Sequence, residues 1–147
     1  MASKKVSKEI STSSLVDVKP ITDNQKIIFE TWKKNKNQFL FGCAGTGKTF
    51  VSLYLALQDV LDLKNPADKV ILVRSLIPTR EIGFLPGDEE DKAALYQVPY
   101  QNMVRFMFQM PNEQSFNNLY DRLKSQGSLY FLSTSFLRGL TFDNAII

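Results

Sequence analysis

A glycine-rich segment, Gly42–Thr49, constrains the fold of this chain more than any other part of its sequence. Its letters, GCAGTGKT, match the phosphate-loop pattern G-x-x-x-x-G-K-[ST] at every fixed position. The segment Gln38–Phe41 before it is typical of a buried strand, and residues 48–63 after it are typical of a helix. Glycines let several backbone N–H groups point at one anion, and the N-terminus of the following helix adds its positive dipole end. This order predicts an α/β fold with a phosphate site.

The chemistry of the loop assigns roles to its residues. Lys48 would reach the β- and γ-phosphates of a nucleotide, and the Thr49 hydroxyl would bind Mg²⁺. Lys48 and Thr49 are therefore predicted to be catalytic, with Thr49 as the metal ligand. The predicted phosphate-binding residues are Gly42, Cys43, Ala44, Gly45, Thr46, Gly47, Lys48 and Thr49. The alternative is a chance glycine turn beside a surface lysine.

The composition narrows the remaining classes of function. The 147 residues suffice for one domain, and 44% of them are hydrophobic, a value typical of globular proteins. The sequence has no histidine and a single cysteine, Cys43, which excludes histidine acid–base catalysis, Cys/His zinc sites and an internal disulfide. No apolar run is as long as a membrane span and the N-terminus is polar, so the sequence predicts a cytoplasmic protein without membrane contact.

The chain divides into an arm and one domain. Residues 1–19 are rich in serine and lysine and are predicted to form a flexible basic arm, followed by a nucleotide-binding domain at 20–147. The arm is either a solvated tail or a segment that touches RNA or DNA, since a net charge of +3 is a modest electrostatic footprint.

Hydrophobic periodicity and turn residues predict the other elements. Thr22 and Gln25 form the capping box of a helix that runs to about Lys34. The β-branched run Lys69–Arg74 predicts a second buried strand, whereas prolines and glycines at 75–100 argue against a long element there. Further helices are expected at 101–109 and 113–124, and further strands at 128–133 and 144–147. This alternation predicts a mostly parallel sheet flanked by helices.

Several blocks in order resemble the PhoH-like P-loop ATPases, which are relatives of the superfamily 1 helicase core. Besides the phosphate loop, Glu81–Asp88 (EIGFLPGD) is close to the family's glutamate followed by G-F-L-P-G-D. Phe136–Phe142 (FLRGLTF) resembles the family's R-G-x-T-[LF] segment. The match extends from about Ile21 to Ile147. The resemblance implies a RecA-like P-loop NTPase core that binds ATP with Mg²⁺.

The sequence departs from the family pattern at four places. The family commonly has proline where Cys43 and Ser75 stand, and a second arginine where Leu140 stands. In the family, the strand that begins at Ala145 continues into a Walker B Asp-Glu pair, which the sequence ending at Ile147 does not contain. The resemblance thus implies a core incomplete at its C-terminus. Such a core would have an apolar edge or slot beside the phosphate loop, which favours association or marginal stability.

The resemblance also implies roles for residues outside the loop. Gln25 would bind the adenine edge, because an amide both donates and accepts, although the capping box explains the same residue without a ligand. Arg74 lies where the helicase relatives contact nucleic acid, or it is a surface arginine. Arg138 is predicted to be catalytic by approaching the nucleotide phosphates; it would otherwise bind RNA or pair with Asp143.

These observations predict an ATP-binding protein that hydrolyses ATP in its complete form. The hydrolysis would be coupled to RNA or another nucleic acid, and the protein could assemble as a homo-oligomer. Glu81 and Asp88 are weaker candidates for the catalytic carboxylate. A non-catalytic module that uses nucleotide to govern RNA or protein binding is the main alternative. A small-molecule kinase is a further alternative, but its closing lid would require arginines that are widely spaced in this sequence.

Overall fold

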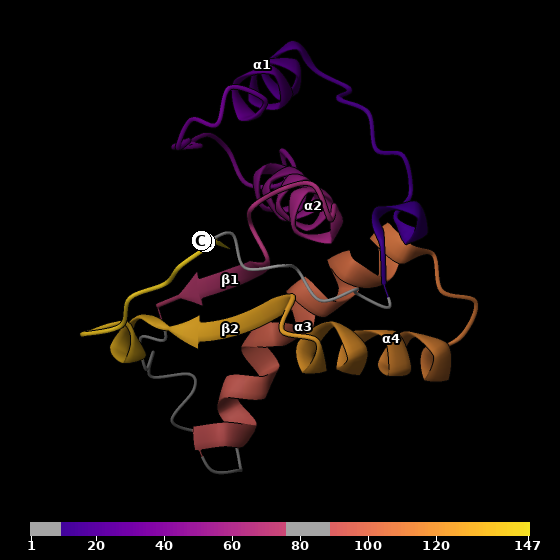
Figure 1. Ribbon diagram of the computed structural model, residues 1–147, viewed down its shortest axis with the longest axis vertical. Helices are drawn as coiled ribbons and strands as arrows, with labels where there is room; N and C mark the ends of the chain where they lie inside the picture. The colour runs from indigo at the N-terminus through magenta and orange to yellow at the C-terminus, as the bar shows by residue number, and fades with distance from the viewer. Residues whose placement is uncertain (1–9, 76–88) are drawn as a thin grey trace.

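A three-stranded parallel sheet forms the centre of the fold. The computed structural model describes residues 10–75 and 89–147, so the predicted block Glu81–Asp88 lies outside the described residues. The strands are β1 (Lys69–Arg74), β2 (Leu129–Ser133) and β3 (Ala145–Ile146), in the order β2-β1-β3. Figure 1 shows β1 and β2 side by side and pointing in the same direction. The sheet and its helices confirm the predicted α/β class.

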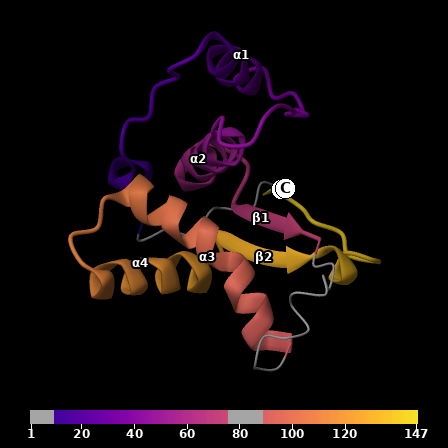
Figure 2. The same ribbon diagram turned by 180° about the vertical axis from the view of Figure 1, so that it is seen from behind.

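The helices cover this sheet in layers. They are α1 (Asp23–Trp32), α2 (Lys48–Leu61), α3 (Glu89–Phe108) and α4 (Glu113–Ser125), with short 3₁₀ helices η1 (Thr12–Ser14) and η3 (Thr134–Phe136). α2 packs against β1, α4 packs against β2, and α3 packs against α4. α1 packs on α2 and lies beyond it, away from the sheet, in both views (Figures 1 and 2).

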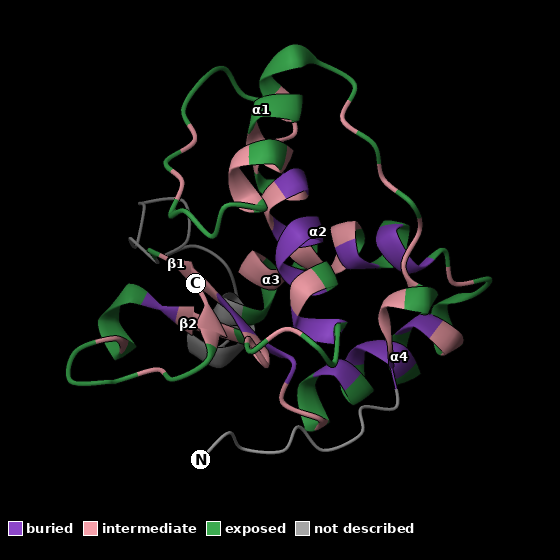
Figure 3. Ribbon diagram, turned by 45° about the horizontal axis from the view of Figure 1, so that its top comes forward, coloured by how far each residue is buried: buried purple, intermediate pink, exposed green. Residues whose placement is uncertain are grey.

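The core lies around α2, whose buried side chains occupy most of its length. Figure 3 shows buried positions along α2 and on the inner face of α4. Leu57 and Val60 of α2, Val104 and Met107 of α3, and Leu123 of α4 have no exposed surface. The helix that follows the phosphate loop is therefore held in place by packing of its apolar side chains against α3 and α4. Burial of apolar surface is the dominant favourable contribution to folding.

The N-terminal segment packs on this core from Ile10 onward. Ile10 is buried, and the Val16 N–H donates to the Met107 carbonyl at 2.8 Å. The Val18 N–H donates to the Tyr54 hydroxyl at 3.2 Å. These bonds tie residues 16–18 to both α3 and α2. The boundary between an arm and a domain at residue 19 stays a prediction.

The predicted strand Gln38–Phe41 is wrong for this structure. The described residues show no strand there, and the Phe39 and Phe41 side chains are 89% and 86% exposed. A strand requires a hydrogen-bonded neighbour, and β3 rather than this segment lies beside β1. The apolar run is present, but no described strand pairs with it.

The predicted break at 75–100 is also wrong in its second half. α3 begins at Glu89 and continues through Pro99 to Phe108. It has 20 residues and therefore begins well before the helix expected at 101–109. Proline removes one helical hydrogen bond, but the packing of Val104, Met107 and Phe108 in the core holds the helix after it. The other predicted elements are confirmed, with bounds that differ by one or two residues from those expected. Both predicted ends of β1 are confirmed.

In the part of the chain that the structure describes, no helix is both long and apolar enough to cross a membrane.

Candidate functional site

The phosphate-loop sequence forms a tight turn that leads directly into α2. Gly45 and Gly47 have φ angles of 77° and 82°, in the left-handed region that favours glycine. Gly47 is the N-cap of α2, and its carbonyl accepts the first bond of the helix from the Val51 N–H at 2.9 Å. The loop is therefore held by a helix whose other turns are buried, and the free N–H groups of that helix face the loop.

The ammonium of Lys48 lies inside the turn. Its Nζ donates to the carbonyl oxygen of Gly42 at 3.0 Å, to the carbonyl oxygen of Cys43, and to Thr46 Oγ1 at 3.3 Å. Thr46 Oγ1 in turn donates to the Cys43 carbonyl at 3.0 Å. The loop thus curls around its own lysine, which places a positive charge where the sequence predicts a phosphate.

Gln25 connects α1 to this loop. The capping box with Thr22 is present, since Gln25 N donates to Thr22 Oγ1 at 3.2 Å and Gln25 Oε1 accepts from the N–H of Ile21 at 2.8 Å and that of Thr22 at 3.4 Å. Its Nε2 donates to the Thr46 carbonyl at 3.4 Å. Both lone pairs of the amide oxygen are therefore in use, and one N–H remains for a ligand.

The other predicted loop residues are open to solvent. Cys43, Ala44, Gly45 and Thr49 are exposed, and a Cβ at Gly42 or Gly45 would meet no heavy atom within 4 Å. Thr49 follows Lys48 at the start of α2, as a metal ligand in this position requires. Among the described residues, no group of three or more acidic, histidine or cysteine side chains is placed to hold a metal ion.

The predicted arginines do not join the loop. Arg138 is exposed in the turn before β3, and the hydrogen bonds and ion pairs of the described residues include none between Arg138 and either the loop or Asp143. The Arg74 guanidinium lies 5.0 Å from the centre of the Tyr96 ring, a cation–π contact with α3. Of the described candidates outside Gly42–Thr49, the structure brings only Gln25 to the loop.

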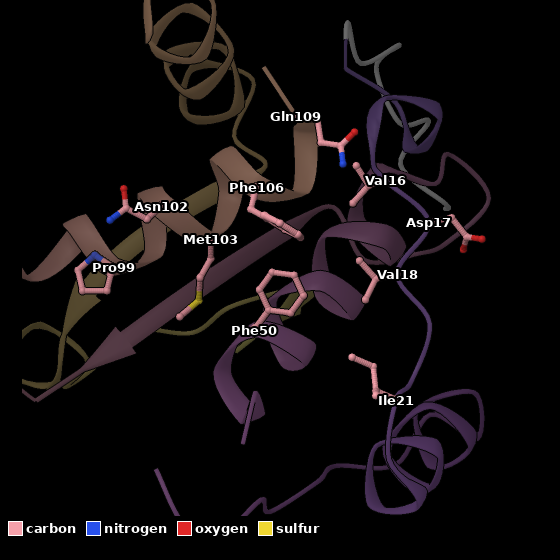
Figure 4. A pocket seen from close by; sticks show the side chains of 10 residues that line it. All are labelled: Val16, Asp17, Val18, Ile21, Phe50, Pro99, Asn102, Met103, Phe106 and Gln109. Atoms are coloured by element: carbon pink, nitrogen blue, oxygen red, sulfur yellow. The ribbon is translucent and has the colours of Figure 1, made fainter. Parts of the chain in front are cut away.

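An apolar groove beside the start of α2 was missed at the level of sequence. It has a volume of about 810 Å³, and Figure 4 shows side chains from the N-terminal segment, α2 and α3 around it. Phe50 of α2 and Phe106 of α3 meet edge to face, with ring centres 5.7 Å apart. Ile21, whose N–H is bonded to Gln25, lines the same groove. The position of Phe50 next to Thr49 was the available signal, but only the fold brings Phe106 to it.

Comparison with known proteins agrees with the motifs. The family described as PhoH-like protein matches residues 17–147. A PhoH-like protein from Synechocystis is 31% identical over 132 residues, which are 88% of this chain and 37% of the relative. A PhoH-like protein from Mycobacterium leprae is 31% identical over 88% of this chain and 35% of the relative, and Protein PhoH from Escherichia coli is 32% identical over 74% and 29%.

This chain spans about a third of the length of those relatives. No solved structure matches the chain significantly. The family match covers the phosphate loop, the sheet and all four helices. The chain therefore belongs to the PhoH-like protein family.

Proposed function

We propose that this chain binds Mg-ATP through Gly42–Thr49 and is the nucleotide-binding part of a PhoH-like ATPase. The observation that supports this best is the position of the Lys48 ammonium, held by the loop carbonyls at the N-terminus of α2. Phosphate oxygens can replace these carbonyls as acceptors, so the lysine keeps its hydrogen bonds when a nucleotide binds. The α2 dipole and the loop N–H groups then act on the same phosphates.

The proposed groups of the site act by binding and orienting. Lys48 would hold the β- and γ-phosphates and offset the charge that develops during transfer, and Thr49 would hold Mg²⁺. Mg²⁺, when bound, neutralises phosphate charge and polarises the γ-phosphoryl group. The groove at Phe50 and Phe106 offers an apolar surface for the base, and Gln25 is hydrogen-bonded both to Ile21 of that groove and to the Thr46 carbonyl of the loop.

The test is nucleotide-dependent thermal unfolding in the presence of Mg²⁺. We expect ATP and ADP to stabilise the chain and AMP to have little effect, because the loop binds the β-phosphate that AMP lacks. At 100 times its dissociation constant, a ligand that binds only the folded state adds about 2.7 kcal/mol to the free energy of unfolding. Equal stabilisation by AMP would show a base or sugar site instead, and no stabilisation by ATP would contradict the proposal.

Phosphate release at saturating Mg-ATP separates the ATPase from a non-catalytic module. Among the described residues, no group of three or more acidic, histidine or cysteine side chains could hold a metal ion, and the sequence lacks the family's Asp-Glu pair, so we expect turnover near background from the 147 residues alone. Measurement with and without single-stranded RNA also tests the proposed coupling to nucleic acid. If turnover is robust and requires Lys48, substitutions Glu81→Gln and Asp88→Asn identify which carboxylate performs the role.

Base selectivity tests the role of Gln25. Gln25→Glu keeps an oxygen acceptor for the capping box but removes the N–H that remains for a ligand. If Gln25 binds adenine, this variant should lose most of the preference for ATP over GTP while α1 stays folded. Titration with both nucleotides gives the ratio of dissociation constants, which corrects for the added negative charge. Gln25→Ala, which removes cap and donor together, is the comparison, and an unchanged ratio in both variants would assign Gln25 to the cap alone.

A further inference from the structure

Two aromatic rings lie together in solvent on the segment between α1 and α2. The Phe39 and Phe41 side chains are almost fully exposed. Their ring centres are 6.5 Å apart and their planes are inclined by 27°, so the rings are close to parallel. Leu40 between them is half-buried, as expected where alternate side chains of an extended chain point to opposite sides. Both rings therefore present their faces to a partner outside the described core.

Three lysines precede these rings. Lys33, Lys34 and Lys36 lie in the turn that ends α1, and all three are exposed. The Asn35 N–H donates to the Trp32 carbonyl at 2.9 Å, which closes the turn. The ion pairs of the described residues include none with these lysines. Their ammonium groups are thus available to an anionic ligand.

The positive charge is not offset by acidic residues nearby in the sequence. No aspartate or glutamate occurs between Glu30 and Asp59. In Figures 1 and 2, the segment between α1 and α2 lies at the edge of the molecule, apart from α3 and α4. We define the lysine–phenylalanine surface as Lys33, Lys34, Lys36, Phe39 and Phe41. Its charge complements a ligand that combines negative charge with flat apolar faces.

We propose that the lysine–phenylalanine surface binds single-stranded nucleic acid. The lysines neutralise phosphates of the backbone, and the two phenylalanine rings stack on neighbouring bases. In a duplex the bases cover one another, so their faces are not available to the rings. The proposal assigns a site to the coupling with nucleic acid and rests on that part of the proposed function, but it requires no bound ATP.

The amides of this segment favour nucleic acid over a membrane surface. A membrane-bound segment also combines lysines with phenylalanines, but it presents one continuous apolar face to the lipid. Here Asn35 and Asn37 alternate with the lysines, and both are exposed. Their amides donate and accept hydrogen bonds, as base edges do.

The test is fluorescence anisotropy of labelled oligonucleotides of about ten residues, without ATP or Mg²⁺. We expect oligo(U) and oligo(dT) to bind alike, because the rings and ammonium groups contact bases and phosphates instead of the sugar. A duplex of the same length should bind at least about tenfold more weakly. With three phosphate contacts, the logarithm of the affinity for oligo(U) should fall with the logarithm of the salt concentration with a slope of roughly −2.

Two matched pairs of substitutions locate the surface. Phe39→Ala should weaken binding of oligo(U) about 5- to 100-fold, whereas Phe136→Ala removes another exposed phenylalanine and should not weaken it. Lys34→Gln should lower the magnitude of the salt slope by about 0.7, and Lys64→Gln should leave it unchanged. All four side chains are exposed, so thermal unfolding should match that of the parent.

Four outcomes would overturn the proposal. Equal affinity for the duplex would indicate attraction by charge alone, and unchanged affinity in Phe39→Ala would place the strand elsewhere. A preference of more than about tenfold for one sugar would contradict recognition through bases and phosphates. Binding to vesicles of phosphatidylcholine and phosphatidylserine that requires Phe39, without binding of oligonucleotide, would assign the surface to a membrane. Since ATP is absent, failure here is distinguishable from failure of the proposed ATP site.

Discussion

Replacing Lys48 with alanine is expected to abolish the stabilisation of this chain by Mg-ATP. The substitution removes the charge that the loop holds through the Gly42 and Cys43 carbonyls. A hydrogen bond between charged groups contributes about 1.5–3 kcal/mol, so ATP affinity should fall roughly 10- to 100-fold or more. Thermal unfolding with and without Mg-ATP measures this, and equal stabilisation of variant and parent would contradict the phosphate-loop assignment.

The matched control for this variant is Lys64→Ala. Lys64 is exposed in the turn after α2, and its removal changes the net charge by the same amount without touching the loop. ATP should stabilise Lys64→Ala as it stabilises the parent. Without nucleotide, Lys48→Ala should unfold within about 1 kcal/mol of the parent, because the buried face of α2 is unchanged. Loss of binding together with loss of fold would remove the specificity of the first result.

Leu57→Ala should destabilise the whole domain by about 2–5 kcal/mol. Leu57 lies at the centre of α2 with no exposed surface, among the core residues of α2, α3 and α4. Its truncation removes apolar contacts and leaves a cavity. The resulting loss is a large part of the free energy of unfolding of a typical domain, which is about 5–15 kcal/mol. Urea unfolding followed by circular dichroism measures the change in free energy.

Gln58→Ala is the neighbour that tests this interpretation. Gln58 is exposed on the same helix, so the substitution keeps helix propensity and removes no buried contact. Its free energy of unfolding should stay within about 0.5 kcal/mol of the parent. Similar losses in both variants would mean that α2 is stabilised by its own backbone instead of by the core.

Local signals predicted the elements that depend on local physics. The β-branched run Lys69–Arg74 is β1, and the loop ends in a helix that begins at Lys48. The capping box of Thr22 and Gln25 is present with both of its hydrogen bonds. These features are set by spacing within a few residues, which a sequence displays.

Features that depend on distant partners could not be predicted. The Phe-Leu-Phe run has the propensity of a strand, but the strand needs a neighbour, and β3 took the place beside β1. Pro99 is a helix breaker by its chemistry, whereas the packing of Val104 and Met107 keeps α3 continuous.

The candidate site divides in the same way. The loop and Lys48 follow from a local pattern, and the structure places them at the helix N-terminus as expected. The bond between Gln25 and the Thr46 carbonyl joins residues 21 positions apart. The meeting of Phe50 and Phe106 likewise needs α3 to cross α2, so neither contact has a signature in the sequence.

Residues 10–18 are attached to the helix that carries the phosphate loop. The Val16 N–H satisfies a carbonyl in the last turn of α3, where helices leave acceptors free, and the Val18 N–H holds the Tyr54 hydroxyl on α2. Together they form a strap across two helices, near the groove beside Phe50. A protease that cut the chain between Val18 and Pro20 would leave every residue of the loop in place and still loosen the support beneath it. The position of the helix that carries the loop thus depends in part on a segment that lies outside the loop sequence.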